Sequence, residues 1–214
     1  MTSHFIERFS RRANDIDSGK VTARQPPPRS PASSGSAAPP PREVIEQKEL
    51  AGLRDEDCVF CGIVADEEPA RTVYEDDLCI AFFDIYPIRP GHTLLIPKAH
   101  YERVPHLPDD LSAHLGRVMP RLCRALGRAL EQPDMNIVSN QGYAQVVPHI
   151  HFHLVPAPKL PGKAPRRGGL PFFNREDLDD DTADALAQRI REAVANEEAE
   201  RPLDRSGSSN RGRL

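Results

Sequence analysis

The sequence has little of several features that mark large classes of protein. It contains no tryptophan, 6% aromatic residues and four cysteines in 214 residues. No apolar run approaches the roughly 20 residues that cross a bilayer, and the N-terminus lacks the apolar core of a secretory signal. We therefore expect neither a membrane protein nor a disulfide-stabilised secreted domain. The net charge of −4 also gives no overall electrostatic case for binding nucleic acid.

These absences favour a location in the cytoplasm, the nucleus or both. Without a secretory signal, reduced or metal-bound cysteines are favoured over disulfides. The first twelve residues place Phe5, Ile6 and Phe9 among arginines and weakly resemble an organellar presequence. Glu7 interrupts that pattern, so we favour a cytoplasmic or nuclear protein over a mitochondrial one.

Composition divides the chain into three parts. Residues 1–54 form an arm rich in Pro, Ser and Ala, which cannot bury enough surface to order itself and which we expect to act as a spacer or to bind protein partners. Residues 55–158 form the folded domain. Residues 159–214 begin with a basic linker, continue in a helix over about 181–198 capped by Asp181 or Thr182, and end in a disordered tail. We expect that helix to dock on the domain or on a partner and to carry no chemistry.

The domain has the pattern of an α+β fold. Alternating and apolar runs bounded by turn residues predict strands over residues 71–75, 78–83, 92–96, 135–139 and 150–155. Asp109 and Asp110 are predicted to cap one long helix that reaches Leu130 and is kinked at Pro120. A short helix over residues 43–53 precedes the domain. The result is an antiparallel sheet of about five strands packed against one long helix.

Three of the eight histidines alternate in the last predicted strand. In an extended strand His149, His151 and His153 would lie on one face, and the apolar residues between them would face the core. A hydrogen-bonded polar residue at a sheet face would explain any single histidine, but three alternating ones among eight are hard to explain in that way. Two chemistries remain open: the imidazoles share a metal ion, or one neutral imidazole attacks phosphorus while its neighbours stabilise the developing charge.

The segment His149-Ile-His-Phe-His-Leu-Val155 resembles the signature of the histidine triad (HIT) superfamily of nucleotide hydrolases and transferases. Further matches follow in order along residues 57–158, about half of the chain. They are Cys58-Val-Phe-Cys-Gly-Ile63, Tyr74-Glu-Asp-Asp77, Ala81-Phe-Phe-Asp-Ile85, Pro90-Gly-His-Thr-Leu-Leu-Ile-Pro-Lys98 and Asn140. The chain is most similar to the phosphoramidase-like branch with a C-x-x-C zinc site, of the fungal type. The resemblance implies the HIT-like fold and a homodimer.

The resemblance also implies roles for individual residues. His151 would be the nucleophile that forms a nucleotidyl-histidine intermediate, His153 would contact the α-phosphate, and His92 would orient the nucleophile. Asp84 would accept hydrogen bonds from the ribose hydroxyls. Contacts to the rest of the nucleotide would come from Phe60, Ile63, Phe82 and Ile85 around a purine base, and from Asn140 and Gln145 at the sugar and phosphate.

A structural zinc ion is the expected cofactor. The pair Cys58 and Cys61 is a weak signal alone, but together with His100 and His149 it makes a Cys₂His₂ set that suits tetrahedral zinc. Members of the family with a C-x-x-C pair resemble this arrangement. His149 would then be a metal ligand and not a base or nucleophile.

The chain departs from the family in the loop between Asn140 and His149, which is about two residues shorter than in common members. Val146 stands where many members carry a Ser or Thr that assists the leaving group. Our leading hypothesis is a hydrolase of purine nucleoside phosphoramidates or similar nucleoside monophosphate conjugates. The alternatives are a dinucleoside polyphosphate hydrolase of the same fold and a zinc-stabilised nucleotide-binding adaptor with weak catalysis.

Overall fold

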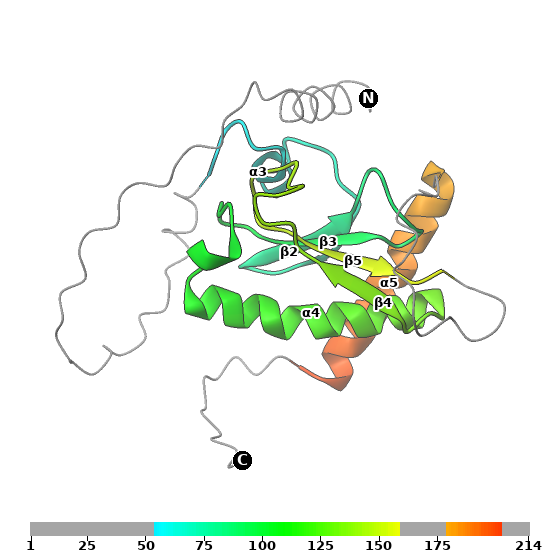
Figure 1. Ribbon diagram of the computed structural model, residues 1–214. Coiled ribbons are helices and arrows are strands. Elements are labelled where there is room, and N and C mark those ends of the chain that lie inside the picture. Colours follow the sequence, from blue (N-terminus) through cyan, green and yellow to red (C-terminus); the bar gives the residue numbers. More distant parts are fainter. Residues whose placement is uncertain (1–53, 159–178, 203–214) are drawn as a thin grey trace, which may run out of the picture.

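The computed structural model describes residues 54–158 and 179–202. The proline-rich arm, the helix predicted over residues 43–53 and the basic linker lie outside these ranges. The described residues form the predicted α+β fold with a five-stranded antiparallel sheet, and helices cover both of its faces instead of one (Figure 1). No helix within the described ranges has both the length and the apolar character needed to span a membrane.

The sheet contains the five strands that the sequence predicts. They are β1 (Thr72–Glu75), β2 (Cys79–Phe83), β3 (Thr93–Pro97), β4 (Met135–Val138) and β5 (Phe152–Pro156). Their order across the sheet is β1-β2-β3-β5-β4, and every neighbouring pair is antiparallel. The two ends of the sheet are therefore β1 and β4, while the histidine-bearing β5 lies between two partners.

Helices cover both faces of the sheet, so its central strands are buried on both sides. In β2 the side chains of Cys79, Ala81 and Phe83 join the core cluster beneath α4, whereas Ile80 and Phe82 join a second cluster beneath α3. This split follows from the period of two in a strand. It explains why β2 is apolar at every position.

The long helix α4 (Asp109–Leu130) lies along one face of the sheet (Figure 1). Its buried residues recur at helical spacing, which confirms the predicted apolar face. The predicted capping was wrong by one position, because Pro108 is the N-cap and has no side-chain cap. Asp109 and Asp110 lie in the first turn, where a carboxylate faces the positive end of the helix dipole. The helix continues through Pro120.

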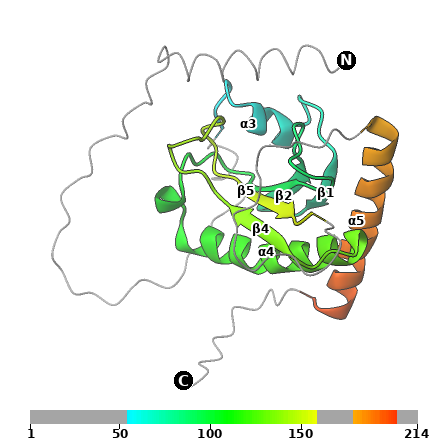
Figure 2. The ribbon, with the colours of Figure 1, turned by 45° about the vertical axis from the view of Figure 1, so that its right-hand side comes forward.

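The opposite face of the sheet is covered by a short helix that was not predicted. This is α3 (Val59–Val64), and it follows directly from Cys58 (Figures 1 and 2). Its six residues are too few to show a helical period in the sequence. A single 3₁₀ turn, η1 (Val104–His106), links β3 to α4.

The C-terminal helix α5 (Asp180–Glu200) packs against α4 and β1 (Figure 2). Leu186, Ile190 and Val194 are buried in the same cluster as the α4 residues. Docking on the domain was one of the two predicted outcomes. The predicted cap was wrong, because Asp179 is the N-cap and accepts a hydrogen bond from the backbone N–H of Thr182.

Ion pairs hold the far half of α5 on α4. Arg124 and Arg128 both bind the buried carboxylate of Glu197, at 2.6 and 2.9 Å. Arg121 adds a 3.1 Å contact to Glu198. At the other end of α5, Arg71 binds Asp184 and Asp180 at 2.7 and 2.5 Å. The helix is thus attached at both ends, and its first turn is held beside the start of β1.

Candidate active site and metal centre

A cavity of about 690 Å³ opens on the α3 side of the sheet. Its walls come from α3, the loop after β2, the segment before β5 and the first turns of α5. Nine residues predicted for catalysis or nucleotide binding line it together: Phe60, Ile63, Phe82, Asp84, Ile85, His92, Asn140, His151 and His153. A volume in the range of ligand pockets with this mixture of apolar and polar walls suits a small organic molecule.

The three alternating histidines do not all lie in a strand. Strand β5 begins at Phe152, so His149 and His151 precede it and the single-strand prediction was wrong for both. The backbone N–H of Ile150 donates to the carbonyl of Tyr101 at 2.6 Å, which ties this segment to the loop after β3 instead of the sheet. The rings of His151 and His153 still lie together, with centroids 4.9 Å apart.

The contacts of His151 define which ring nitrogen faces the cavity. Its Nδ1 lies 2.6 Å from the backbone carbonyl oxygen of His149 and must donate, because a carbonyl only accepts. The lone pair is therefore on Nε2, which has no hydrogen-bond partner among the described residues. Burial lowers the pKa of His151, outweighing the bond to the His149 carbonyl, which raises it. The ring is a neutral imidazole with its basic nitrogen available.

His92 and His153 form a directed pair. The backbone N–H of Ile88 donates to Nδ1 of His92 at 3.2 Å, which leaves the His92 proton on Nε2. That Nε2–H donates to Nδ1 of His153 at 3.0 Å, so the proton of a neutral His153 is on its Nε2. An Oδ atom of Asp84 lies 3.6 Å from His92 and 3.9 Å from His153. These three side chains have metal-ligand spacing, but the proton on His92 Nε2 occupies the position that an ion would need.

The predicted polar contacts divide into two groups. Asn140 lines the cavity. The side-chain amide of Gln145 instead accepts from the backbone N–H of Gly142 at 2.8 Å and donates to the carbonyl of Glu102 at 2.7 Å. Gln145 therefore holds the shortened loop in place in this structure and is not among the residues that line the cavity. Val146 does line it.

The predicted zinc ligands converge behind the cavity. Cys58, Cys61, His100 and His149 place one ligand atom each within 4.8 Å of one another. The Sγ atom of Cys61 lies 3.3 Å from Nδ1 of His100 and 3.7 Å from Nδ1 of His149, and Sγ of Cys58 lies 3.6 Å from Nδ1 of His149. Tetrahedral zinc with ordinary bond lengths holds sulfur and nitrogen ligands about 3.5 Å apart.

The chemistry of these donors also fits zinc. Nε2 of His149 lies 2.9 Å from the carbonyl oxygen of Pro97 and donates to it, which leaves the Nδ1 lone pair directed at the cysteines. The pKa of Cys61 lies far below its ordinary value, chiefly because the Cys58 thiol donates a hydrogen bond to the Cys61 thiolate. A thiolate beside imidazole lone pairs is the donor set that zinc selects.

The cavity has one wall that the sequence did not predict. Asp180, Ala183 and Asp184 of α5 line it, as does Arg71. The helix was expected to carry no chemistry, yet side chains of its first turns line the cavity. A signal was present: Asp180 and Asp184 are four apart and so lie on one helix face, beside an apolar residue at 183.

Comparison with known proteins identifies the fold. The family model for the HIT domain matches residues 65–160. An uncharacterized HIT-like protein of Methanocaldococcus jannaschii is 43% identical over 46% of this chain and 78% of its own length. The chain belongs to the HIT family.

Other HIT proteins similar to this chain are described by a hydrolytic activity, by nucleotide binding or by bound zinc. The adenylylsulfatase HINT3 of Arabidopsis thaliana is 37% identical over 47% of this chain and 52% of its own length. A hypothetical histidine triad nucleotide-binding protein of Sulfolobus tokodaii superposes with a TM-score of 0.57 at 30% identity, over 66% of this chain and 94% of that one. A zinc-bound HIT protein of Mycobacterium smegmatis gives 0.55 at 35% identity, over 67% and 96%. The family thus includes nucleotide-binding proteins and hydrolases.

Proposed function

We propose that this HIT protein hydrolyses purine nucleoside phosphoramidates or similar conjugates of a nucleoside monophosphate, as in the phosphoramidase-like branch. The observation that carries the proposal is the hydrogen bond from His151 Nδ1 to the carbonyl of His149. It directs the lone pair of a buried, neutral imidazole into a cavity whose other walls suit a nucleoside. A neutral imidazole is the form that attacks phosphorus.

The reaction proceeds in two displacements. Nε2 of His151 attacks the α-phosphorus, so a P–N bond to His151 forms while the bond from phosphorus to the leaving group breaks. The leaving group departs with the electron pair and takes up a proton. Water then attacks the same phosphorus and forms a P–O bond while the P–N bond to His151 breaks, and one water proton passes to solvent. The products are a nucleoside monophosphate and neutral His151.

Neighbouring side chains bind and orient the nucleotide. The Nε2–H of His153 is a donor to a phosphate oxygen, and the bond from His92 keeps it in that tautomer. Asp84, a carboxylate at the cavity wall, accepts from the vicinal ribose hydroxyls. Phe60, Ile63 and Phe82 provide flat apolar contacts for a base, and Asn140 contacts the sugar and phosphate.

Zinc at Cys58, Cys61, His100 and His149 has a structural role in this proposal. When bound, it supplies a cross-link between the start of α3 and the segment before β5. His149 then has two functions: its ring is a ligand and its carbonyl oxygen orients His151. None of the four zinc ligands lines the cavity.

One observation favours a second substrate class. Ala144, Val146 and Val147 line the cavity and have no hydroxyl that could donate a proton to a departing amine. A phosphate or other anhydride leaving group departs as a stable anion and needs less assistance. A dinucleoside polyphosphate is therefore the alternative substrate.

The covalent intermediate gives a direct test. Mass spectrometry of the protein mixed with an adenosine or guanosine phosphoramidate should detect a nucleotidyl adduct on His151. His151→Ala should lower turnover by at least about 10⁴-fold while nucleoside monophosphate affinity changes less than about threefold. Diadenosine polyphosphate in parallel distinguishes the two substrate classes. Full turnover by His151→Ala, or an adduct on another residue, would contradict the mechanism.

A further inference from the structure

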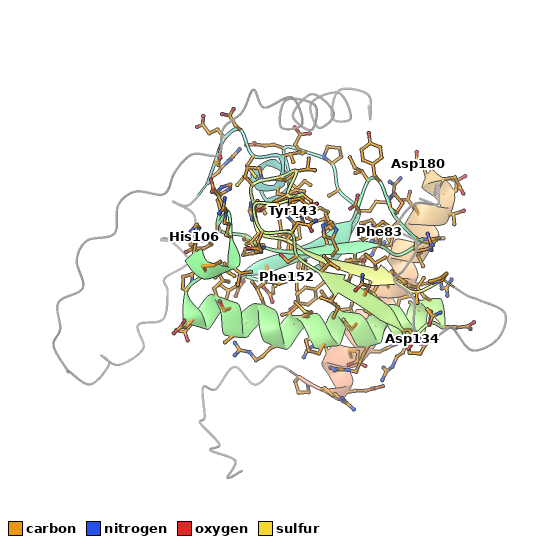
Figure 3. All side chains as sticks on the ribbon, viewed as in Figure 1. Phe83, His106, Asp134, Tyr143, Phe152 and Asp180 are labelled. Carbon is orange, nitrogen blue, oxygen red and sulfur yellow. The ribbon has the colours of Figure 1, made fainter. Side chains whose placement is uncertain are left out.

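The pairing of β4 with β5 stops just before the residue proposed as nucleophile. The last pair in this ladder is Val138 with His153 (Figure 3, where the neighbouring Phe152 is labelled). His151 is 5% exposed, so its backbone carbonyl needs a hydrogen-bond donor from the protein. The hydroxyl of Ser139, the first residue after β4, donates to that carbonyl at 2.8 Å. A side chain thus takes over from the strand backbone at the carbonyl of His151.

The side-chain amide of Gln141 directs the hydroxyl of Ser139. The backbone N–H of Val104 donates to Oε1 of Gln141 at 2.8 Å, so the amide atom beside Ser139 is the nitrogen Nε2. This Nε2 donates to Oγ of Ser139 at 2.7 Å and to the carbonyl of Asn140 at 3.2 Å. Because the amide nitrogen only donates, the hydroxyl proton of Ser139 is left for the carbonyl of His151.

Residues 101–104, which follow β3, bind the same region from another direction. The carbonyl of Tyr101 accepts from the backbone N–H of Ile150 at 2.6 Å. The carbonyl of Glu102 accepts from the amide of Gln145 at 2.7 Å. Together with the bond to the Gln141 amide, these contacts attach one short segment to the loop and to the residue before the nucleophile. The backbone on both sides of the nucleophile is therefore bound.

The orientation of the His151 ring depends on this backbone. Its Nδ1 donates to the carbonyl of His149 at 2.6 Å, a contact that lasts only while the two residues keep their relative position. Ser139 and Gln141 are not among the residues that line the cavity, so they act through His151 and do not touch the nucleotide. A misplacement of about 1 Å can slow a reaction about a hundredfold.

We propose that Ser139 and Gln141 are positioning residues, whose hydrogen bonds hold the backbone of His151 so that Nε2 of its ring points at the α-phosphorus. The inference rests on the proposed function, because it takes His151 to be the attacking group. It adds two residues to the site that contribute to the rate of attack and not to nucleotide affinity.

The first test removes the hydroxyl. In Ser139→Ala, formation of the His151 adduct from an adenosine phosphoramidate in a single turnover should slow by about 10- to 100-fold. The dissociation constant of AMP, measured by calorimetry, should change less than about threefold. Nitrogen NMR of the imidazoles should show one His151 tautomer, Nδ1–H, in the unmodified protein and a mixture in the variant. Ser139→Thr keeps the hydroxyl and should restore both the rate and the single tautomer. Ser112→Ala, at an exposed serine of α4, is the control.

The second test redirects the hydroxyl without removing it. Gln141→Glu keeps an acceptor for the N–H of Val104 but places an acceptor oxygen where Nε2 donated to Ser139. The hydroxyl then donates to the carboxylate, because a charged acceptor binds it more strongly than the His151 carbonyl does. Adduct formation should again slow by about 10- to 100-fold. Tyr143→Glu is the matched control, since it adds the same charge to the same loop at a side chain that is 88% exposed and does not line the cavity.

The outcomes separate this inference from the proposed function. An unchanged rate and a single tautomer in both Ser139→Ala and Gln141→Glu would overturn the positioning role even if His151 forms its adduct. A slower reaction that weaker AMP binding explains in full, with the tautomer unchanged, would also overturn it. If the unmodified protein forms no adduct but the tautomer changes in Ser139→Ala, the positioning role stands and the hydrolase is contradicted. The thermal midpoint shows whether each variant folds, and Gln141→Glu, at an exposed side chain, decides the question if Ser139→Ala unfolds.

Discussion

At the scale of single residues, the candidate site is a set of imidazoles whose tautomers are defined by backbone groups. The carbonyl oxygens of His149 and Pro97 accept from His151 and His149, and the N–H of Ile88 donates to His92. Backbone positions are held by the fold, so these three rings are oriented without help from a flexible side chain, and His153 takes its tautomer from His92. As a result, the imidazoles differ in which ring nitrogen carries the proton and which one is basic.

The residue types of the site could be predicted from the sequence, but their tautomers could not. The alternating spacing placed His151 and His153 together, and the family resemblance grouped the four zinc ligands. Which nitrogen of His151 is basic depends on a carbonyl that faces it only after the segment leaves the strand geometry. The position of Gln145 could not be predicted, because it depends on the conformation of a short loop whose sequence has neither helical nor alternating periodicity.

The zinc set makes a prediction at this scale. Purified protein should contain one zinc per chain, and Cys58→Ser should lose it and lower the thermal midpoint by at least about 5 °C, because metal binding contributes to folding stability. Elemental analysis and calorimetry measure both quantities. Cys123→Ser is the control, since Cys123 is outside the cluster. Stoichiometric zinc in Cys58→Ser would show that the ion binds elsewhere.

At the scale of elements, β1 and β2 are joined by a turn whose stability depends on one carboxylate. Asp76 accepts from the backbone N–H groups of Leu78 and Cys79, both at 2.8 Å, from the hydroxyl of Tyr74 at 2.6 Å and from His114 at 2.7 Å. His114 had no motif in the sequence. It connects this turn to α4.

Asp76→Ala should destabilise the protein by about 2–4 kcal/mol, because four hydrogen-bond donors lose their acceptor. Burial opposes ionisation of Asp76, yet the bonds from His114, Tyr74 and the backbone keep its pKa well below the ordinary value. A depressed pKa stabilises the fold above the ordinary carboxyl pKa and less so as the pH falls below it. Urea unfolding should therefore show a smaller difference from Asp76→Asn below about pH 4 than at pH 7.

The neighbouring Asp77 provides the control for that experiment. Asp77 is exposed in the same turn, so Asp77→Ala should change the unfolding free energy by less than about 0.5 kcal/mol. Equal effects of the two alanine variants would show that the Asp76 network contributes little.

The elements show where sequence periodicity is informative. All five strands and the long helix have enough alternating or helical positions to be recognised, and their ends were predicted to within two residues. The short α3 has too few. The prediction of β5 began two residues early because Ile150 and His151 continue the alternation although their backbone lies outside the sheet, where the N–H of Ile150 binds Tyr101.

At the scale of the whole molecule, the two edges of the sheet differ. Helix α5 packs along β1, where Arg191 donates to the carbonyl of Thr72 at 3.0 Å. Strand β4 has no such cover among the described residues and presents Ile137 with 46% exposure. An uncovered edge with an apolar side chain is a template for pairing with another chain.

We therefore expect a homodimer that pairs through the β4 edge. Analytical ultracentrifugation should find a dimer, and Ile137→Lys should shift it toward monomer by placing two like charges at the interface. Ala185→Lys, on the exposed side of α5 at the other edge, should leave the dimer unchanged. A dimer that is insensitive to Ile137→Lys would place the interface on another surface.

Because α5 forms one wall of the cavity, a truncated form of the protein must retain this helix to keep the site complete. The matched HIT domain spans residues 65–160, yet Cys58 and Cys61 precede that span and Arg71 binds a helix that follows it. A fragment cut to the matched residues would retain His151 and His153 but lose half of the zinc ligands, the acidic wall of the cavity and the cover over β1. Such a fragment would have two uncovered sheet edges, and its tendency to aggregate would say little about the full-length protein.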